Sequence, residues 1–337
     1  MTSFNVSVPA IEKLLDHLAS GVGAVGGPWI AEWRAKKEAQ AALIAAEGEA
    51  ERLRILTEAR TESLRAYALA QTQARALLGS PGSTVQGEID VSDMITARIR
   101  FQEEKRQRNI RAVAEQAAYE LGDKQVEDRE PDHDWTARFF SDVQDVSSEE
   151  MQLLWSRVLA GEVERPGRTS VRTLGILKNI DKETANLFAR LCSLCISIRL
   201  GSDNLVDARV PSLGKDAAHN ALKNFGLAFG VLNVLNEHGL IISDYNSWRD
   251  YRMCIGLQVG SPSSQIVRIP FQFQGAAWIF EPVGARSNTS QFRVSGVTLS
   301  QAGMELSRVV EPIADEKYAR ALQAFFASQS LRMTSFS

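Results

Sequence analysis

Apolar side chains recur at helical spacing through the N-terminal part of the chain. The segment PAIEKLLDHLAS places them at i, i+3, i+4 and i+7, which predicts a short amphipathic helix over residues 9–20. Residues 30–78 are rich in Ala, Glu, Arg and Leu and contain no proline, so they predict one long helix. A second long helix is predicted over residues 90–121, ending at Gly122. Both long helices have sparse apolar positions, which is typical of a helix that pairs with another copy in a coiled coil.

Local capping signals divide residues 134–195 into three further helices. Ser147 and Glu150 have the spacing of a capping box. Thr169 or Ser170 is expected to begin the second helix and Asp181 to cap the third. These signals predict a compact helical module in the middle of the chain.

The turn between the first two of these helices also carries expectations. Gly161 is expected to stop or bend the first helix, and Pro166 with Gly167 to turn the chain. Glu162 and Arg172 are expected to form an ion pair across this turn.

Beyond residue 200 the pattern changes to one helix followed by short runs of β-forming residues. A helix is predicted over residues 220–240, and the strand-like runs are RMCIGLQV, QIVRIPFQF, AWIFEP and FRVSGVTL. Another helix follows at residues 300–313, and the chain is expected to finish with a helix and a frayed tail. The fold class predicted is mostly α with a C-terminal α+β, winged-helix-like domain. The expected divisions are 1–82 (N-terminal segment and long arm), 83–130 (second long helix and acidic linker), 131–200 (central helices), 201–320 (α+β domain) and 321–337 (helix and tail).

Composition narrows the function classes. The chain has 337 residues, of which 44% are hydrophobic and 23% charged, and this composition is ordinary for a globular protein. Its net charge of −3 excludes binding of nucleic acid through the overall charge of the protein alone. Three cysteines are too few for a disulfide framework and fit a reducing compartment. The chain shows neither a secretory signal nor an apolar run of about 20 residues, so no transmembrane span is predicted. We expect a cytoplasmic protein, with peripheral contact to the inner membrane as an alternative.

Residues 95–310 resemble a known family. The runs RFQEEKRQRNIRAVAEQA and LWSRVLAGEVERPG are similar to the bacterial family called domain of unknown function 2806. The resemblance implies a helical arm, a central helical module and a C-terminal α+β part. It implies no reaction, ligand or site residue, because the family has no assigned activity. The overall plan also loosely resembles bacterial abortive-infection and phage-defence proteins.

Three short motifs have plainer explanations than the sites they suggest. GVGAVG at 21–26 matches a dinucleotide fingerprint, but it follows a helix where the fingerprint needs a strand, so a hinge is expected. CSLC at 192–195 has metal or redox spacing but lies in an apolar helical stretch, so we expect core residues. DHD at 132–134 is expected to belong to a linker. The sequence therefore predicts no cofactor, no metal and no catalytic constellation.

Two groups of basic residues are candidates for binding phosphates or anionic lipids. The first lies on the second long helix and consists of Arg98, Arg100, Lys105, Arg106, Arg108 and Arg111. A solvated helix face, or pairing with the acidic linker, is the alternative. The second lies in the expected winged-helix-like domain and consists of Arg249, Arg252, Arg268 and Arg293.

A third group suggests a membrane interface near the N-terminus. Tryptophan and basic side chains favour that zone, and the candidates are Trp29, Trp33, Arg34, Lys36 and Lys37. Packing against a partner helix is the alternative.

We therefore expect a non-enzymatic interaction or regulatory protein that self-associates through residues 30–120, with a setting in phage defence or stress response. A further protein partner is compatible with this expectation. The alternatives are a nucleic-acid-binding winged-helix protein and a peripheral membrane effector.

Overall fold

A computed structural model describes residues 13–14, 91–122, 124–129, 132–201, 204–215, 219–259, 265–284 and 291–336. The described residues form nine α-helices and one 3₁₀ helix, five of them before the first strand of the described chain and five after it. They are α4 (Val91–Leu121), α5 (His133–Val143), α6 (Glu149–Glu164), α7 (Val171–Lys178), α8 (Lys182–Leu194), η2 (Ala221–Phe225), α9 (Phe229–Glu237), α10 (Arg252–Ile255), α11 (Gln301–Leu306) and α12 (Glu316–Ser328).

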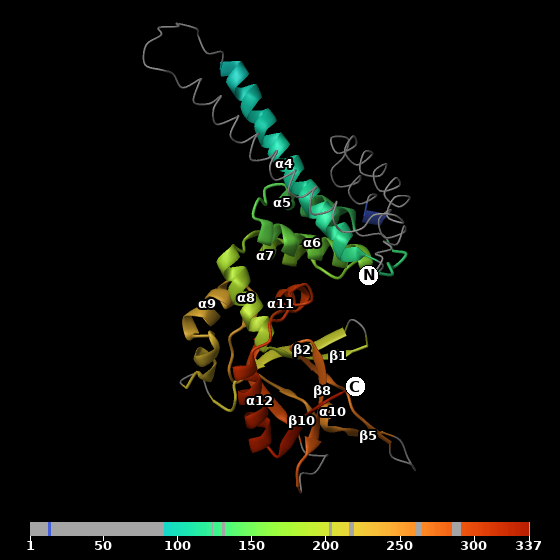
Figure 1. The fold of residues 1–337 in the computed structure, drawn as a ribbon, viewed down its shortest axis with the longest axis vertical. Helices are drawn as coiled ribbons and strands as arrows, with labels where there is room; N and C mark the ends of the chain where they lie inside the picture. Colours follow the sequence, from blue (N-terminus) through green and yellow to red (C-terminus); the bar gives the residue numbers. More distant parts are fainter. Residues whose placement is uncertain are drawn as a thin grey trace, which may run out of the picture.

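The strands follow α8 in the chain and lie below α4, α5, α6 and α7 in Figure 1. They are β1 (Ile196–Leu200), β2 (Asn204–Pro211), β3 (Ile241–Ile242), β4 (Trp248–Asp250), β5 (Leu257–Val259), β6 (Gln265–Val267), β7 (Phe271–Phe273), β8 (Ala276–Pro282), β9 (Arg293–Leu299) and β10 (Leu331–Ser335).

Eight of these strands form one antiparallel sheet, and this finding corrects the predicted winged-helix-like domain. The strand order is β10-β8-β7-β1-β2-β9-β3, with β4 also paired to β9, while β5 and β6 form a separate pair. A winged helix has a small sheet beside a helical core, whereas here the broad sheet is itself the centre of the C-terminal part. The winged-helix prediction is therefore wrong, although a helical N-terminal part followed by an α+β part is what the structure has.

The core of the C-terminal part lies between the sheet and α12. Tyr318, Leu322 and Phe326 form the buried face of α12. The Phe326 ring lies 4.6 Å from that of Phe280 on β8, measured between centroids, and Phe280 stacks on Phe271 of β7 at 4.5 Å. Burial of large aromatic side chains at this spacing fixes the helix to one face of the sheet.

The core of the helical part is also aromatic. Trp135 and Phe139 on α5 stack at 5.1 Å, and Phe139 meets Trp155 of α6 edge to face at 5.3 Å. The C-terminal half of α4 packs on α6 through small and apolar residues such as Val113 and Ala117, both fully buried. The N-terminal half of α4 projects away from α5, α6 and α7, as the cyan end of the helix shows (Figure 1).

The helix predictions agree closely with the structure where the signals were local. The helix predicted over 90–121 is α4, Ser170 caps α7 by accepting from Thr173 N at 3.2 Å, and Asp181 caps α8 by accepting from Thr184 N at 2.7 Å. The capping box predicted from Ser147 is wrong: Ser148 is the N-cap of α6, and its hydroxyl donates to Glu150.

Gly161 does not stop α6, which continues to Glu164. A Cβ at Gly161 would come no nearer than 3.9 Å to the described structure, so a close approach does not require glycine at this position.

Other differences lie in the C-terminal part. The helix predicted over 220–240 is two pieces, η2 and α9, because Gly226 adopts a left-handed conformation at φ 84°. The segment Arg252–Ile255 is helical where a strand was expected, and the expected frayed tail is strand β10, which pairs with β8. The boundary predicted at residue 200 falls between β1 and β2, which pair with each other.

Of the predicted N-terminal helix over 9–20, only Lys13 and Leu14 lie within the described residues, where both are helical and Leu14 is fully buried. The helix predicted over 30–78 and the hinge at 21–26 lie outside the described residues. Within the described part of the chain, each helix is too short or too polar to cross a bilayer.

Candidate functional site

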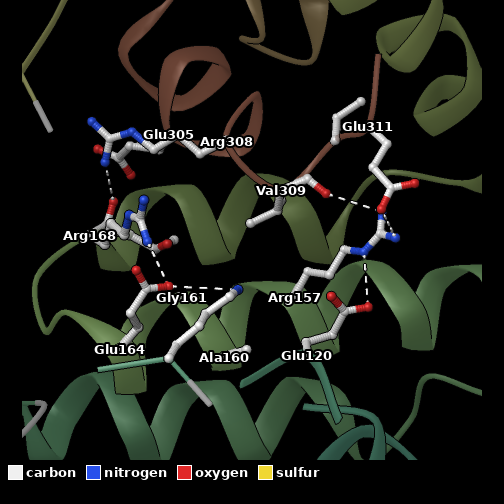
Figure 2. A pocket seen from close by; sticks show the side chains of 13 residues that line it. Glu120, Arg157, Ala160, Gly161, Glu164, Arg168, Glu305, Arg308, Val309 and Glu311 are labelled. Carbon is white, nitrogen blue, oxygen red and sulfur yellow. Dashed lines mark hydrogen bonds and ion pairs between the residues drawn. The ribbon is translucent and has the colours of Figure 1, made fainter. Parts of the chain in front are cut away.

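A polar pocket of about 310 Å³ lies where α4, α6 and the segment after α11 meet. Charged residues of both signs line it: Glu120, Lys124, Arg157, Glu164, Arg168, Glu305, Arg308 and Glu311. Figure 2 shows these side chains converging from the three elements. We call this feature the junction pocket, because it joins the helical part to the sheet part.

Arg157 holds one side of the junction pocket together. Its guanidinium reaches from α6 to Glu120 of α4 at 3.4 Å and to Glu311 at 2.7 Å, and also donates to the Val309 carbonyl at 3.4 Å (Figure 2). A guanidinium presents several donors in a fixed plane, so one side chain can link three segments in this way. Arg157 therefore ties α6 to α4 and to the segment after α11.

The other side of the junction pocket contains more basic than acidic groups. Arg168 pairs with Glu164 at 3.2 Å, and Lys124 approaches the same carboxylate at 3.8 Å. Arg308 donates to the Arg168 carbonyl at 3.3 Å (Figure 2). Burial, followed by the positive charge of Arg168, lowers the pKa of Arg308.

Two buried carboxylates at or near the junction pocket accept hydrogen bonds from backbone N–H groups. Glu162 accepts from the N–H groups of Gly167, Arg168 and Thr169, and its burial raises its pKa against the effect of these hydrogen bonds. Glu305 accepts from Ser170 N at 2.7 Å. The expected ion pair between Glu162 and Arg172 is therefore wrong, since the carboxylate turns inward to hold the loop after α6.

The predicted basic residues lie along α4, and three of them are ion-paired. Arg100 pairs with Glu104 at 2.9 Å and Arg111 with Glu115 at 2.9 Å, each one helical turn away. Arg106 pairs with Asp145 at 3.2 Å. These pairs neutralise part of the local positive charge. Arg98, Lys105 and Arg108 are exposed.

The four arginines predicted for a winged-helix surface do not form one patch. Arg249 and Arg293 lie on the paired strands β4 and β9, where Arg249 is opposite Val294 and Arg293 is opposite Asp250. Successive residues of a strand point to opposite faces, so these two side chains face opposite ways.

The other two of these arginines are bound to neighbouring groups. Arg252 pairs with Asp250 at 3.0 Å, and Arg268 donates to the Ile255 carbonyl at 3.1 Å.

The remaining predicted motifs have structural positions. Asp132 is the N-cap of α5 rather than part of a linker. Cys192 and Cys195 are half-buried free thiols at the end of α8, and burial raises the pKa of both. The described residues contain no cluster of three ligands that would hold a metal ion. The membrane-interface candidates Trp29, Trp33, Arg34, Lys36 and Lys37 lie outside the described residues.

Sequence reasoning missed two groups of residues. One is a buried network on β2, in which Arg209 forms two contacts with Asp207, at 2.6 and 2.7 Å, and Tyr251 donates to the same carboxylate at 2.9 Å. The other is the charged lining of the junction pocket, which brings together Arg168 and Arg308 from segments far apart in the chain. The run RPGR at 165–168 was a local signal for the second group. No sequence pattern, however, connects this run to Arg308, which lies 140 residues later.

Comparison with known proteins gives one match. Residues 93–323 match the model of the family described as "Protein of unknown function (DUF2806)", which confirms the resemblance found in the sequence. No curated protein and no solved structure is significantly similar to the chain.

Proposed function

The chain belongs to the DUF2806 family, and from the geometry we propose that it works as an interaction protein that self-associates through residues 30–120. The described part of the proposed contact surface is the projecting half of α4. The observation that supports the proposal most directly is a set of large apolar side chains exposed on that half: Met94 at 59%, Ile95 at 50%, Ile99 at 57% and Phe101 at 54%.

Two of these side chains, Ile95 and Ile99, continue the stripe that α4 buries against α6. Ile95 and Ile99 precede Val113 and Ala117 by 18 residues, which is five full turns of an α-helix, so each pair lies on the same face. Val113 and Ala117 are fully buried, whereas Ile95 and Ile99 are half exposed. The apolar face of the helix is thus longer than the part that α6 covers, and exposed faces of this kind favour a protein partner.

A second copy of the chain suits this face better than a nucleic acid. Glu103 and Glu104 lie about one helical turn after Arg98 and Arg100, so an antiparallel second α4 brings acidic groups opposite basic ones. Nucleic acid would instead favour an uninterrupted basic stripe. The ion pairs on α4 leave a face of mixed charge.

The described side chains supply part of the association energy. Complete burial of the half-exposed Ile95 and Ile99 gives about 1 kcal/mol each, or about 4 kcal/mol for a symmetric pair. Association costs at least about 4 kcal/mol in lost freedom, and by some estimates far more. We therefore propose that the interface includes further residues between 30 and 90, with the α4 patch as an essential part.

Light scattering coupled to size-exclusion chromatography tests the proposal. The full chain is expected to elute with a multiple of its own mass at micromolar concentration, and Ile95→Glu with Ile99→Glu to shift it to a single-chain mass. Ile313→Glu is the matched control, because Ile313 is 70% exposed and lies far along the chain from α4. A wild-type monomer, or an unchanged mass for the double variant, contradicts the proposal. The predicted setting in defence or stress response stays a prediction.

A further inference from the structure

The strand β10 lies at one end of the eight-stranded sheet, and its outer side has no partner among the described residues. It is an end strand of the sheet order and pairs there with β8 alone. An unpaired edge of this kind presents a row of backbone N–H and C=O groups that another extended chain can pair with. The hydrogen bonds around β10 show which residues carry those groups.

Alternate residues of β10 face β8. On the side of β8, the Ser330 carbonyl accepts a hydrogen bond at 2.9 Å and Phe336 N donates one at 2.9 Å. In an antiparallel pair every second residue is bonded to the neighbouring strand, so the even-numbered residues are the ones bonded to β8. The N–H and C=O groups of Leu331, Met333 and Ser335 therefore point to the outer side. We call these three residues the outer edge.

A groove of about 480 Å³ lies beside the outer edge, between β10 and α12, which Figure 1 shows next to each other. Two exposed residues one helical turn apart, Gln323 and Ala327, form its wall on α12. The groove is mostly apolar, and its lining residues are Val283, Gln323, Ala327, Ser330, Leu331, Arg332 and Met333. A groove of this character beside an unpaired edge suits a bound strand that places apolar side chains in it.

The direction of the side chains on β10 fixes which residues of an added strand would enter the groove. Leu331 and Met333 are the buried residues of β10, so their side chains lie on the core side of the sheet, where α12 packs. Residues directly opposite each other on neighbouring strands share one face. Positions opposite Leu331 and Met333 would therefore face the groove, and apolar side chains fit there.

The residue between them carries the charge. Arg332 is exposed, and its side chain points to the other face of the sheet because successive residues alternate. Its partner on β8 is Glu281. On the outer side no described residue stands opposite it, and an acidic residue there would form a favourable cross-strand pair. A second β10 in full antiparallel overlap would place Thr334 opposite Arg332, so another copy of the chain does not supply this carboxylate.

We propose that the outer edge of β10 binds an extended segment of another protein as an additional antiparallel strand. The segment has apolar residues opposite Leu331 and Met333 and an acidic residue opposite Arg332. Antiparallel pairing follows the rest of the sheet, in which β10 and β8 already run this way. The outer edge belongs to the sheet part and not to α4, so a failure of this proposal leaves the self-association proposal standing.

Fluorescence anisotropy of the full chain with labelled synthetic peptides tests the proposal. The probe is a short peptide with valine, glutamate and valine at its centre and serine and threonine on both sides. N-methylation of the two valines removes the N–H groups that face the outer edge, and affinity is expected to fall by about tenfold or more. N-methylation of the glutamate is the matched control, because its N–H group points away from β10; affinity is expected to stay the same.

Variants of the protein test the groove and the charge separately. Ala327→Glu fills the groove with a charged side chain and is expected to weaken binding by about tenfold. Ala324→Glu is the control, because Ala324 is also exposed on α12 but does not line the groove. The wild-type protein is expected to bind the glutamate peptide about threefold more tightly than a peptide with lysine in its place, and Arg332→Gln to remove this difference.

Several results overturn the proposal. One is absence of binding of the glutamate peptide at millimolar concentration, and another is equal weakening by the two kinds of N-methylation. Unchanged affinity in Ala327→Glu also overturns it. A peptide copied from residues 330–336 of this chain that binds more tightly than the glutamate peptide assigns the outer edge to a second copy instead, and so rejects a foreign segment.

Discussion

Replacement of Asp207 by alanine is expected to destabilise the protein by about 4 kcal/mol, because it leaves a buried arginine without its counter-ion. Arg209 is 3% exposed and Asp207 6%. Burial opposes the charged form, and the hydrogen bonds and negative charge of Asp207 raise the pKa of Arg209. Because an arginine side chain is not deprotonated in proteins, the guanidinium stays charged when the carboxylate is removed. Breaking a buried pair costs about 3–5 kcal/mol. The Tyr251 hydroxyl also loses its acceptor, whereas the carbonyls of Ser247 and Val294 still accept hydrogen bonds from Arg209.

Urea and thermal unfolding followed by circular dichroism measure this loss. For a folded domain of about 150–250 residues, a loss of about 4 kcal/mol corresponds to a fall in melting temperature of roughly 8–16 °C. Asp207→Val combined with Arg209→Met removes both charges and is expected to cost less than Asp207→Ala alone, since an apolar pair replaces an ion pair at little cost. Arg320→Ala, in an exposed pair, is expected to change stability by less than about 0.5 kcal/mol. A loss below about 1 kcal/mol for Asp207→Ala, or a double variant worse than the single one, refutes the reasoning.

Three further predictions concern single contacts. Gly303→Ala places a Cβ 2.0 Å from the Leu240 carbonyl oxygen, so the backbone must shift and unfolding experiments should show a loss of about 3 kcal/mol; a loss within error of zero would show that the contact relaxes freely. Glu162→Ala leaves three backbone N–H groups without their acceptor, and a loss of about 2 kcal/mol is expected in urea melts, with a neutral result indicating that water replaces the carboxylate. Hydrogen bonds from Lys182, which contributes most, from the backbone and from Ser148 lower the pKa of Glu150 to about 2, so Lys182→Ala should raise that pKa part of the way to 4.5 in an NMR titration. Because the folded pKa is the lower one, the stabilisation is present above the unfolded value and is lost as pH falls towards 2; an unchanged titration curve for Glu150 would contradict this.

Helices could be predicted from the sequence because their signals are local. The caps Ser170 and Asp181 lie three residues from the N–H groups they accept. The long helix α4 has the composition and spacing of a helix along its whole length. Both kinds of signal are complete within one or two turns, so tertiary structure is not needed to interpret them.

The sheet could not be predicted because its partners are distant in the sequence. Ile196 on β1 pairs with Phe273 on β7, and Arg209 on β2 pairs with Thr298 on β9. β2 also has an unusual pattern, since its last residues are buried without alternation and include an ion pair. A strand with polar residues in its interior resembles a loop when only periodicity is considered.

The candidate site had the same difficulty. Arg168 and Arg308 are each unremarkable in their local sequence, and the packing of α11 against α7 brings the second near the first, so that both line the junction pocket. The predicted basic residues on α4 were visible as a run, but the sequence alone did not show which would pair with Glu104, Glu115 and Asp145. Proximity in space rather than along the chain decides which charges are neutralised.

The self-association surface and the junction pocket lie at opposite ends of α4, and this separation makes a final prediction. Ile95 and Glu120 are 25 residues apart on one helix, or about 38 Å at 1.5 Å per residue. Glu120 is fixed to α6 by Arg157, so a change at the junction pocket has no direct path to the far end of α4 except movement of the whole helix. We therefore expect Arg157→Gln to leave the association constant unchanged in light scattering, whereas Ile95→Glu with Ile99→Glu abolishes association. If Arg157→Gln changes the association constant, the junction contacts and association are linked, and linkage requires that association stabilise those contacts by the same factor.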